Sequence, residues 1–577
     1  MIKKLAKSIR EYKKDTILTP LCVAVEVVLE VVIPLLMAKI IDEGVYLGHM
    51  NTVLKVGVML VLCAIMSLIF GTLSGKYAAR ASAGFAKNLR KDLYDKVQDF
   101  SFRNIDKFST SSLVTRLTTD VGWVQMAFQM ITRVAVRAPL MLLISLAFAV
   151  SISAKLSLVF LICVPILAVG LYFIATTAHP IMKRVFKTYD VLNNVVEENV
   201  AGIRVVKSFV TEEKEQKKFE KVSDQIYRDF SKGEKILAFN SPIMQFTMYL
   251  CIILISWFGS KMIVTSGMTE LTTGELMTML TYSIQILSSL MMLSFILVMI
   301  TISRSAAERI VEVLDETPEI KDGKENIKEI KDGSIEFVNA CFSYVNEQDK
   351  ECLKDINLKI ESGETIGIIG GTGSGKSSLV NLIPRLYDVV EGEVKVAGEN
   401  VKKYNVEALR NAVSVVLQKN VLFSGTIKEN IRWGKEDATD EEIEKVCRQA
   451  KADEFIESFP DKYNTYIEQG GSNVSGGQKQ RLCIARALMK RPKILILDDS
   501  TSAVDTKTES QIRKAFKEEL PETTKIIIAQ RISSVEDCDR IIVMEDGKIN
   551  QIGTHKELLR SNEIYKEVYE SQQKGDE

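Results

Sequence analysis

Five long apolar runs dominate the first half of the chain, and charged segments separate them. Each run covers the roughly 20 residues that a helix needs to cross the hydrocarbon core of a bilayer. One run is long enough for two helices that turn at 151–155, so the pattern predicts six membrane spans. A buried helix of a soluble protein rarely continues this far without charge. The runs lie at 17–38, 56–75, 137–179, 236–260 and 276–303.

The charged connections between these runs predict the orientation. The long segments 76–133 and 183–235 are rich in Lys and Arg, whereas the short connections 42–52 and 264–274 contain neither. By the positive-inside rule, the long loops and both termini are cytoplasmic, in a multi-pass protein of the plasma membrane. The basic start MIKKLAKSIREYKK predicts an interfacial helix that leads into the first span, rather than a signal peptide.

The two cytoplasmic loops are too long to be simple connectors. Their helical periodicity predicts that the membrane helices continue into the cytoplasm and present 111–121 and 201–209 toward the C-terminal domain. Solvated helix faces are the alternative. We expect a transmembrane domain at 1–310, a linker at 311–334 and a soluble domain at 335–577.

Composition narrows the function classes. The 577 residues include 74 basic and 74 acidic side chains, and the net charge of zero argues against a nucleic-acid binder. Nine cysteines without a C-x-x-C pair, together with three histidines, support neither a zinc site nor a disulfide framework. The mean hydropathy of +0.08 averages an apolar half and a soluble half, and the six spans exclude a soluble ATPase.

A phosphate-binding loop follows the strand-like run Thr365–Ile369. The sequence GGTGSGKSS has the P-loop spacing, in which glycines let backbone N–H groups surround phosphate oxygens at a helix N-terminus. Lys376 would reach the β- and γ-phosphates of a nucleotide, and Ser377 would ligate Mg²⁺. The predicted nucleotide-binding residues are Gly370, Gly371, Thr372, Gly373, Ser374, Gly375, Lys376, Ser377 and Ser378.

Two later segments complete a nucleotide-site pattern. The apolar run Ile494–Asp498 predicts a buried strand that ends in a Mg²⁺-binding carboxylate. The loop 473–478 precedes an Arg-containing helix and predicts a second anion contact, although an ordinary glycine-rich helix cap is the alternative. Its predicted binding residues are Ser475, Gly476, Gly477 and Gln478.

Taken in order, these motifs resemble the nucleotide-binding domain of ABC transporters, and the whole chain resembles a type IV ABC exporter half-transporter. The resemblance implies a six-span α-helical transmembrane domain with long cytoplasmic helical extensions, followed by an α/β P-loop NTPase (ABC) domain. It also implies that Tyr344 stacks on adenine. Gln418 would be both a Mg²⁺ ligand and a catalytic residue, which senses Mg²⁺ and the γ-phosphate. Ser475 and Gly477 would contact ATP held by the opposite subunit.

Further segments carry the resemblance. SSLVTRLTTDV and ENVAGIRVVKSF resemble the family's two intracellular-loop regions, which house its coupling helices. The D-loop would be Ser502–Asp505, and GTHKEL at Gly553–Leu558 also matches.

Two residues depart from the family's pattern at its catalytic positions. Asp499 stands where the family has Glu, so the carboxylate sits roughly 1.5 Å further back, and a ~1 Å misplacement can cost about 100-fold in rate. Gln530 replaces the switch His and cannot become cationic. A positioned acid–base group contributes roughly 10²- to 10⁴-fold, so the pair predicts slow hydrolysis at this site. The pattern resembles the degenerate half of heterodimeric exporters, and tolerated drift is the alternative.

The acidic residues Glu26 and Glu30 lie one turn apart in the first span. Such groups are costly in the membrane and face a cavity or a partner. They predict either a cation-attracting patch in the translocation path or a polar contact between helices. We therefore expect one half of an ATP- and Mg²⁺-dependent exporter of amphipathic drugs or lipids, paired with a second half-transporter. A lipid, peptide or siderophore transporter, or a non-pumping sensor or ATP-gated channel, is the alternative.

Overall fold

The computed structural model describes residues 1–345, 351–499 and 506–573. The chain folds as two compact units. The helical unit contains Met1–Gln98 and Ser109–Glu316, and the α/β unit contains Asp99–Phe108 and Thr317–Glu577. One short segment from the N-terminal half of the sequence therefore belongs to the second unit.

The helical unit carries six helical segments long and apolar enough to cross a membrane, counted over the described residues. This number confirms the prediction from the apolar runs. Its elements are α1 (Ile2–Leu5), η1 (Ala6–Tyr12), α2 (Lys13–Lys39), η2 (Ile40–Val45), α3 (Met50–Gln98), α5 (Thr110–Thr115), η3 (Arg116–Asp120), α6 (Val121–Ile152), α7 (Ala154–Ala201), α8 (Ile203–Ser208), α9 (Glu212–Leu237), α10 (Asn240–Ser266) and α11 (Thr273–Asp315).

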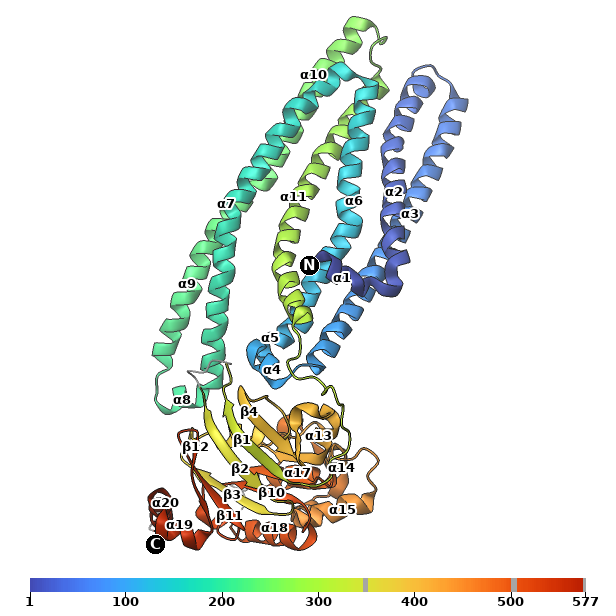
Figure 1. Cartoon of the computed structure of the whole chain (residues 1–577). Helices are drawn as coiled ribbons and strands as arrows, with labels where there is room; N and C mark the ends of the chain where they lie inside the picture. Colours follow the sequence, from blue (N-terminus) through green and yellow to red (C-terminus); the bar gives the residue numbers. More distant parts are fainter. Residues whose placement is uncertain (346–350, 500–505, 574–577) are drawn as a thin grey trace. The chain divides into compact units, whose positions relative to one another are not determined.

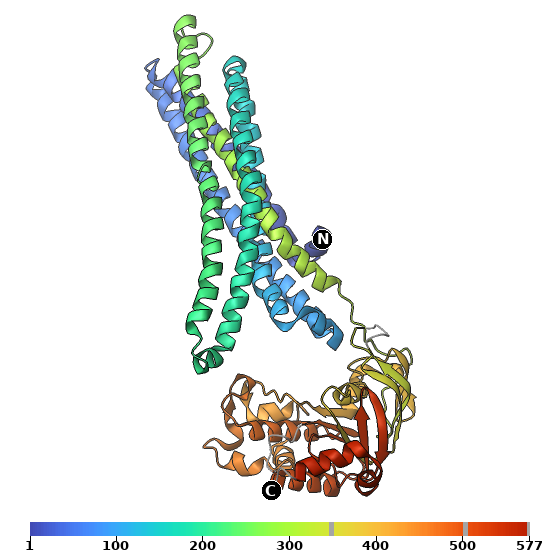
Figure 2. The same cartoon turned by 90° about the vertical axis from the view of Figure 1, so that its left-hand side faces the viewer.

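Several of these helices are far longer than a bilayer requires. Helix α3 has 49 residues and α7 has 48. At 1.5 Å per residue each is roughly 70 Å long, more than twice the ~30 Å hydrocarbon core. Helices α7 and α9 run side by side to a tip at α8, as Figures 1 and 2 show. The predicted helical extensions are therefore present.

A segment that the sequence analysis did not single out belongs to the α/β unit. The predicted segment 111–121 forms α5 and η3 inside the helical unit, where buried Asp120 accepts hydrogen bonds from Arg309 of α11. The segment that packs in the α/β unit comes earlier, at Asp99–Phe108, and contains helix α4 (Phe102–Phe108). Its apolar residues Phe100 and Phe108 are buried and stacked on one another.

The α/β unit is built on two main sheets. One is antiparallel, in the order β2-β1-β4-β5, and the other has the order β12-β11-β3-β10-β9-β6, with β12 antiparallel at its edge. The strands are β1 (Ile335–Phe342), β2 (Leu353–Ile360), β3 (Thr365–Gly370), β4 (Glu391–Val396), β5 (Glu399–Asn400), β6 (Val413–Val416), β7 (Gly425–Thr426), β8 (Tyr466–Ile467), β9 (Ile494–Asp498), β10 (Thr524–Ile528), β11 (Arg540–Glu545) and β12 (Lys548–Gly553).

Helices cover these sheets and connect their strands. They are α12 (Lys376–Asn381), η5 (Val401–Lys403), α13 (Val406–Ala412), α14 (Ile427–Arg432), α15 (Asp440–Gln449), α16 (Asp453–Glu457), η6 (Lys462–Asn464), η7 (Gln469–Gly471), α17 (Gly476–Met489), α18 (Thr506–Glu519), η8 (Ile532–Ser534), α19 (His555–Ser561) and α20 (Glu563–Gln573).

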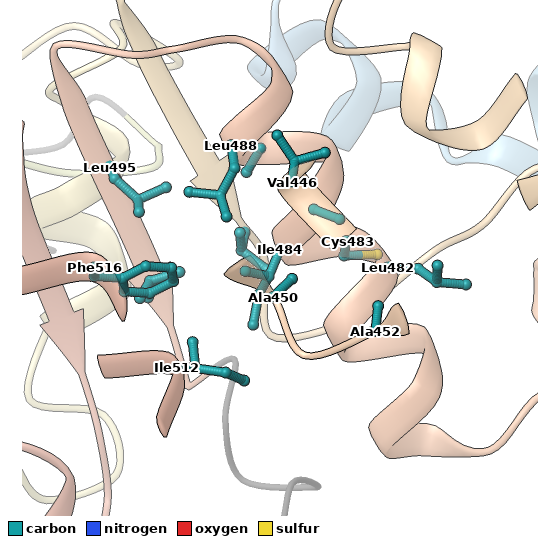
Figure 3. Close-up of a cluster of buried hydrophobic side chains, with 14 of the residues drawn as sticks. Val446, Ala450, Ala452, Leu482, Cys483, Ile484, Leu488, Leu495, Ile512 and Phe516 are labelled. Atoms are coloured by element: carbon teal, nitrogen blue, oxygen red, sulfur yellow. The ribbon is translucent and has the colours of Figure 1, made fainter. Parts of the chain in front are cut away.

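An apolar cluster fixes α17 against the large sheet. Ile484 and Leu488 of α17 lie with Leu495 of β9 and with Ile512 and Phe516 of α18, as Figure 3 shows. All five side chains are buried, and full burial of such a side chain contributes about 1.5–3 kcal/mol. This packing holds α17 rigidly, while its first residues remain at the surface.

Candidate nucleotide-binding site

Strand order in the large sheet brings the predicted site residues together. Strands β3, β10, β9 and β6 are neighbours and parallel, so their carboxyl ends meet at one edge. Gly370 ends β3 and Asp498 ends β9, while Gln530 and Gln418 follow β10 and β6. Ligands of parallel α/β sheets bind at this edge.

The geometry of the P-loop requires its glycines. Gly373 and Gly375 have φ values of +84° and +94°, which L side chains rarely adopt. A Cβ at Gly370 would lie 2.3 Å from the carbonyl oxygen of Met544. A Cβ at Gly371 or Gly373 would meet no atom within 4 Å, so open space lies over this part of the loop. The loop thus has room for a phosphate group beside exposed backbone N–H donors.

Lys376 begins helix α12 and folds back over the loop. Its Nζ donates hydrogen bonds to the carbonyl oxygens of Gly370 at 2.9 Å and Gly371 at 2.8 Å, and to the Ser374 hydroxyl at 3.4 Å. Burial lowers the pKa of Lys376, and the nearby carboxylates of Asp498 and Asp499 act in the opposite direction. An anionic phosphate placed here would give the ammonium a charged acceptor in place of neutral oxygens, which strengthens its hydrogen bonds.

Two oxygen ligands suited to Mg²⁺ lie side by side. The Ser377 hydroxyl donates a hydrogen bond of 3.1 Å to Oδ1 of Asp498. Burial raises the pKa of Asp498, the Ser377 hydrogen bond lowers it, and the charge of Asp499 raises it further. A hydroxyl and one carboxylate fit a metal that usually binds one or two carboxylates together with substrate phosphates.

The two residues at the altered catalytic positions contact each other. Oδ2 of Asp499 accepts a 2.8 Å hydrogen bond from Nε2 of Gln530 and a 3.3 Å hydrogen bond from Nε2 of Gln418. Asp499 is only 8% exposed and has a φ of +46°, in the left-handed region. Its carboxylate is thus held by two neutral amides.

Tyr344 and Ser378 form one end of the site. Tyr344 follows β1, and its hydroxyl lies 3.0 Å from the hydroxyl of buried Ser378 in α12. The Tyr344 side chain stays 41% exposed, which leaves part of the ring free for an aromatic ligand. Burial raises the pKa of the Tyr344 hydroxyl. The Ser378 hydroxyl is thus engaged by Tyr344, while the exposed part of the Tyr344 ring is open to a ligand.

The predicted signature segment caps helix α17. The Ser475 hydroxyl accepts from the backbone N–H of Gln478, and the Gln478 side chain accepts from the Ser475 N–H. Ser475 and Gly476 are exposed, whereas Gly477 and Gln478 are partly buried. This capping box leaves other N–H groups of the first turn available to an anion. The predicted D-loop, Ser502–Asp505, lies outside the described residues.

The acidic pair of the first span has a basic partner that the sequence analysis did not assign. Arg137 of α6 bonds to Oε1 of Glu26 at 2.6 Å and to the two carboxylate oxygens of Glu30 at 2.7 and 2.8 Å. Ser74 of α3 adds a 3.4 Å hydrogen bond to Glu26. We call Glu26, Glu30 and Arg137 the membrane triad. Its geometry is a polar contact between helices, the second of the two interpretations.

Sequence reasoning also missed Tyr387 and Gln572. The Tyr387 ring packs edge-on against Tyr344, with centroids 5.1 Å apart. The Gln572 amide donates to the Gln530 carbonyl at 2.8 Å and accepts from the Ile532 N–H at 2.9 Å. Neither residue lies in a motif. For Arg137 a signal did exist, because acidic residues in a membrane span need a basic partner.

Comparison with known proteins agrees with this architecture. Residues 16–290 match the model of the ABC transporter transmembrane region, and residues 353–502 match that of the ABC transporter. An uncharacterized ABC transporter ATP-binding protein, YfiB of Bacillus subtilis (strain 168), is 38% identical over 95% of this chain and 94% of its own length. The ATP-dependent lipid A-core flippase of Hahella chejuensis is 33% identical over 86% of this chain and 84% of its own length.

The fold is also that of a solved transporter. The structure of a bacterial Atm1-family ABC exporter with ATP bound aligns with a TM-score of 0.84 at 23% identity, over 97% of this chain and 99% of that one. The chain therefore belongs to the ABC transporter family. It is a multi-pass plasma-membrane protein with a fused ATP-binding domain in the cytoplasm, and its fold is that of an exporter.

Proposed function

We propose that this chain is one half of a dimeric ABC exporter that moves amphipathic small molecules, drugs or lipids, out of the cytoplasm. ATP would bind with its phosphates in the loop Gly370–Ser378 and its adenine on Tyr344, while Ser377, Asp498 and Gln418 would hold Mg²⁺. The flippase activity named for the Hahella chejuensis relative supports the lipid part of this substrate class. A membrane protein with an exporter fold and a soluble ATP-binding unit fits a pump better than a channel or sensor.

We further propose that the chain's own ATP site hydrolyses slowly. The observation that carries this proposal is the contact between the Asp499 carboxylate and the neutral Gln530 amide, at 2.8 Å. A carboxylate that polarises the attacking water must accept its proton, and here two amides that donate to Oδ2 compete with a water for that oxygen. Gln530 also cannot supply the positive charge that would stabilise the γ-phosphate in the transition state.

The signature segment, by contrast, keeps its helix N-terminus exposed. We propose that Ser475–Gln478 completes the ATP site of a partner half-transporter that carries Glu and His at the two altered positions. The working unit would then be a heterodimer with one fast and one slow ATP site. The slow site would hold ATP through many transport cycles and keep the two nucleotide units together.

The test uses the chain alone, reconstituted in liposomes, so that both ATP sites of any dimer carry Asp499 and Gln530. We expect slow ATP hydrolysis by the wild-type chain and a rise of about 100-fold in Asp499→Glu/Gln530→His, because the carboxylate regains its reach. Asp499→Asn is the matched control and should stay slow. A wild-type chain as fast as the double variant would disprove the slow-site proposal.

Transport is measured separately, as ATP-driven uptake of a fluorescent cationic amphiphile or a labelled phospholipid into inverted vesicles. Vesicles that contain the Lys376→Ala variant are the control. Uptake only down a gradient would favour the channel alternative.

A further inference from the structure

An aromatic cluster in the α/β unit connects Tyr344 with helix α4. The ring of Tyr344 packs edge-on against Phe342 and Tyr387, with centroid distances of 4.8 and 5.1 Å and interplanar angles of 73° and 87°. Tyr387 in turn lies 6.0 Å from Phe102 of α4, centroid to centroid. Tyr344 and α4 are thus separated by a single buried side chain, that of Tyr387.

A hydrogen bond fixes the far end of Tyr387. Its hydroxyl donates to Oδ2 of Asp106 in α4 at 2.8 Å. Burial raises the pKa of the Tyr387 hydroxyl, and the Asp106 carboxylate raises it further, so the group remains a proton donor at neutral pH. One end of Tyr387 therefore touches Tyr344, and the other end is bonded to a charged residue of α4.

A second connection runs through the backbone beside Tyr344. Nη2 of Arg103 in α4 donates to the carbonyl oxygen of Ser343 at 3.1 Å, and its Nη1 pairs with Glu319 at 2.8 Å. Asn104 donates to the carbonyl oxygen of Thr317 at 3.2 Å. Helix α4 thus contacts the residue that precedes Tyr344 and the chain that leads into the α/β unit.

We propose that Tyr387 is a positioning residue that couples the nucleotide base to α4, so that stacking of adenine on Tyr344 fixes the position of this helix. The inference rests on the proposed role of Tyr344. A base on the exposed part of Tyr344 restrains that ring, the perpendicular Tyr387 ring is restrained with it, and the hydroxyl passes the restraint to Asp106. Because only residues 99–101 and 109 separate α4 from α3 and α5, the helical unit would respond to the base as well as to the phosphates.

The cluster predicts which nucleotides act on α4. ATP and ADP both carry adenine, so both should slow amide hydrogen exchange in 99–108. Inorganic tripolyphosphate carries phosphates without a base and should leave exchange in this segment unchanged. Protection by ATP and tripolyphosphate alike would show that phosphates are sufficient, and protection by ATP but not ADP would show that the γ-phosphate is required. Either result would overturn the proposal.

The variant test removes only the link. In the full chain in nanodiscs, Tyr387→Phe keeps the ring contacts and deletes the hydrogen bond to Asp106. We expect ATP affinity to stay within about threefold of wild type, while the ATP-dependent protection of 99–108 falls about tenfold, the factor set by one hydrogen bond to a charged group. Asp106→Ala deletes the same bond from α4 and replaces Tyr387→Phe if that variant fails to fold.

Tyr404→Phe is the matched control. Its hydroxyl is also buried and donates a 2.8 Å hydrogen bond, but to the carbonyl oxygen of Val396. It should leave the ATP-dependent protection of 99–108 intact. Full protection in Tyr387→Phe at wild-type ATP affinity would overturn the coupling role. Unchanged ATP affinity in Tyr344→Ala would instead refute the base-stacking role on which the inference rests, so the two failures are distinguishable.

Discussion

The membrane triad and the nucleotide site each contain one basic and two acidic side chains, but they use them differently. In the helical unit, Arg137 bonds directly to Glu26 and Glu30. In the α/β unit, Lys376 bonds to backbone carbonyls and a hydroxyl. The bonds of Asp498 and Asp499 described above go to a hydroxyl and to amides.

This difference separates a structural cluster from a binding cluster. Charges that neutralise one another have little interaction left for a ligand, and breaking such a pair inside the membrane leaves a charge without compensation. Lys376, whose hydrogen bonds go to neutral oxygens, keeps its capacity to bind phosphate, and Asp498, which accepts from the Ser377 hydroxyl, keeps its capacity to bind Mg²⁺. The comparison therefore predicts that substitutions in the triad affect stability, whereas those in the nucleotide site affect binding.

The largest effect is expected for Arg137→Met. Removing the guanidinium leaves the buried Glu26 carboxylate and the partly buried Glu30 carboxylate without their cation, and loss of one partner of a buried pair costs about 3–5 kcal/mol. Unfolding in mixed detergent micelles measures the loss. The triple variant with Glu26→Gln and Glu30→Gln should recover most of it.

The control, Lys155→Met, breaks an exposed 3.3 Å pair with Glu270 and should cost below about 1 kcal/mol. Equal stability of the two single variants would contradict the structural role.

Lys376→Met should lower nucleotide affinity and leave the unfolding free energy without nucleotide nearly unchanged. Its hydrogen bonds to phosphate would be charge-assisted, and their loss costs about 1.5–3 kcal/mol, or roughly 10- to 100-fold in affinity. Equilibrium binding of a fluorescent ATP analogue measures this loss. Lys403→Met, which removes an exposed cation paired with Glu325 and Glu399, is the control and should bind normally. A large loss of stability in Lys376→Met would erase the contrast with the triad.

Gln572→Ala tests how firmly α20 holds the backbone at Gln530 and Ile532, beside Asp499 of the nucleotide site. The Gln572 amide makes two hydrogen bonds to the backbone at 530 and 532, and each contributes about 1 kcal/mol. We expect hydrogen exchange at 529–533 to increase about fivefold, with little change in ATP affinity. Gln573→Ala removes only a contact with Tyr569 on the same helix and should leave this exchange unchanged. Equal hydrogen exchange at 529–533 in the two variants would show that α20 does not hold this segment.

The sequence predicted the features that depend on local pattern. The six predicted spans and the glycine spacing of 370–377 have direct counterparts in the observed helices and loop, because span length and backbone conformation are encoded locally. The partners of these features come from distant segments and were missed. Arg137 lies more than one hundred residues from Glu26, and Tyr387 meets Asp106 across an even longer separation. Side chains brought together by tertiary packing carry no periodic signal.

The α4 segment shows the same limit. We expected 111–121 to be presented toward the C-terminal domain, whereas the part of this loop that belongs to the α/β unit is Asp99–Phe108. Helical periodicity identifies the extension but does not indicate where the chain bends. The contact of Phe102 with Tyr387 joins residues far apart in the sequence, so the local pattern gives no sign of it.

The smallest expected effect is a pH-dependent gain in stability for Asp498→Asn. Burial raises the pKa of this carboxyl group above its unfolded value, against the opposing Ser377 hydrogen bond. The folded state therefore holds the proton more tightly, and this contribution to stability is present at low pH and is lost as the pH rises through the folded pKa. Asparagine carries no charge to lose, so nucleotide-free Asp498→Asn should melt above wild type at pH 8 and close to it at pH 4. Glu26→Gln serves as the counterpart in the triad and should melt below wild type at pH 8, because it takes a carboxylate away from Arg137. At pH 8, the melting temperature should therefore rise in the variant of the binding cluster and fall in the variant of the structural cluster. A change of the same sign in both variants would remove the distinction between the two clusters.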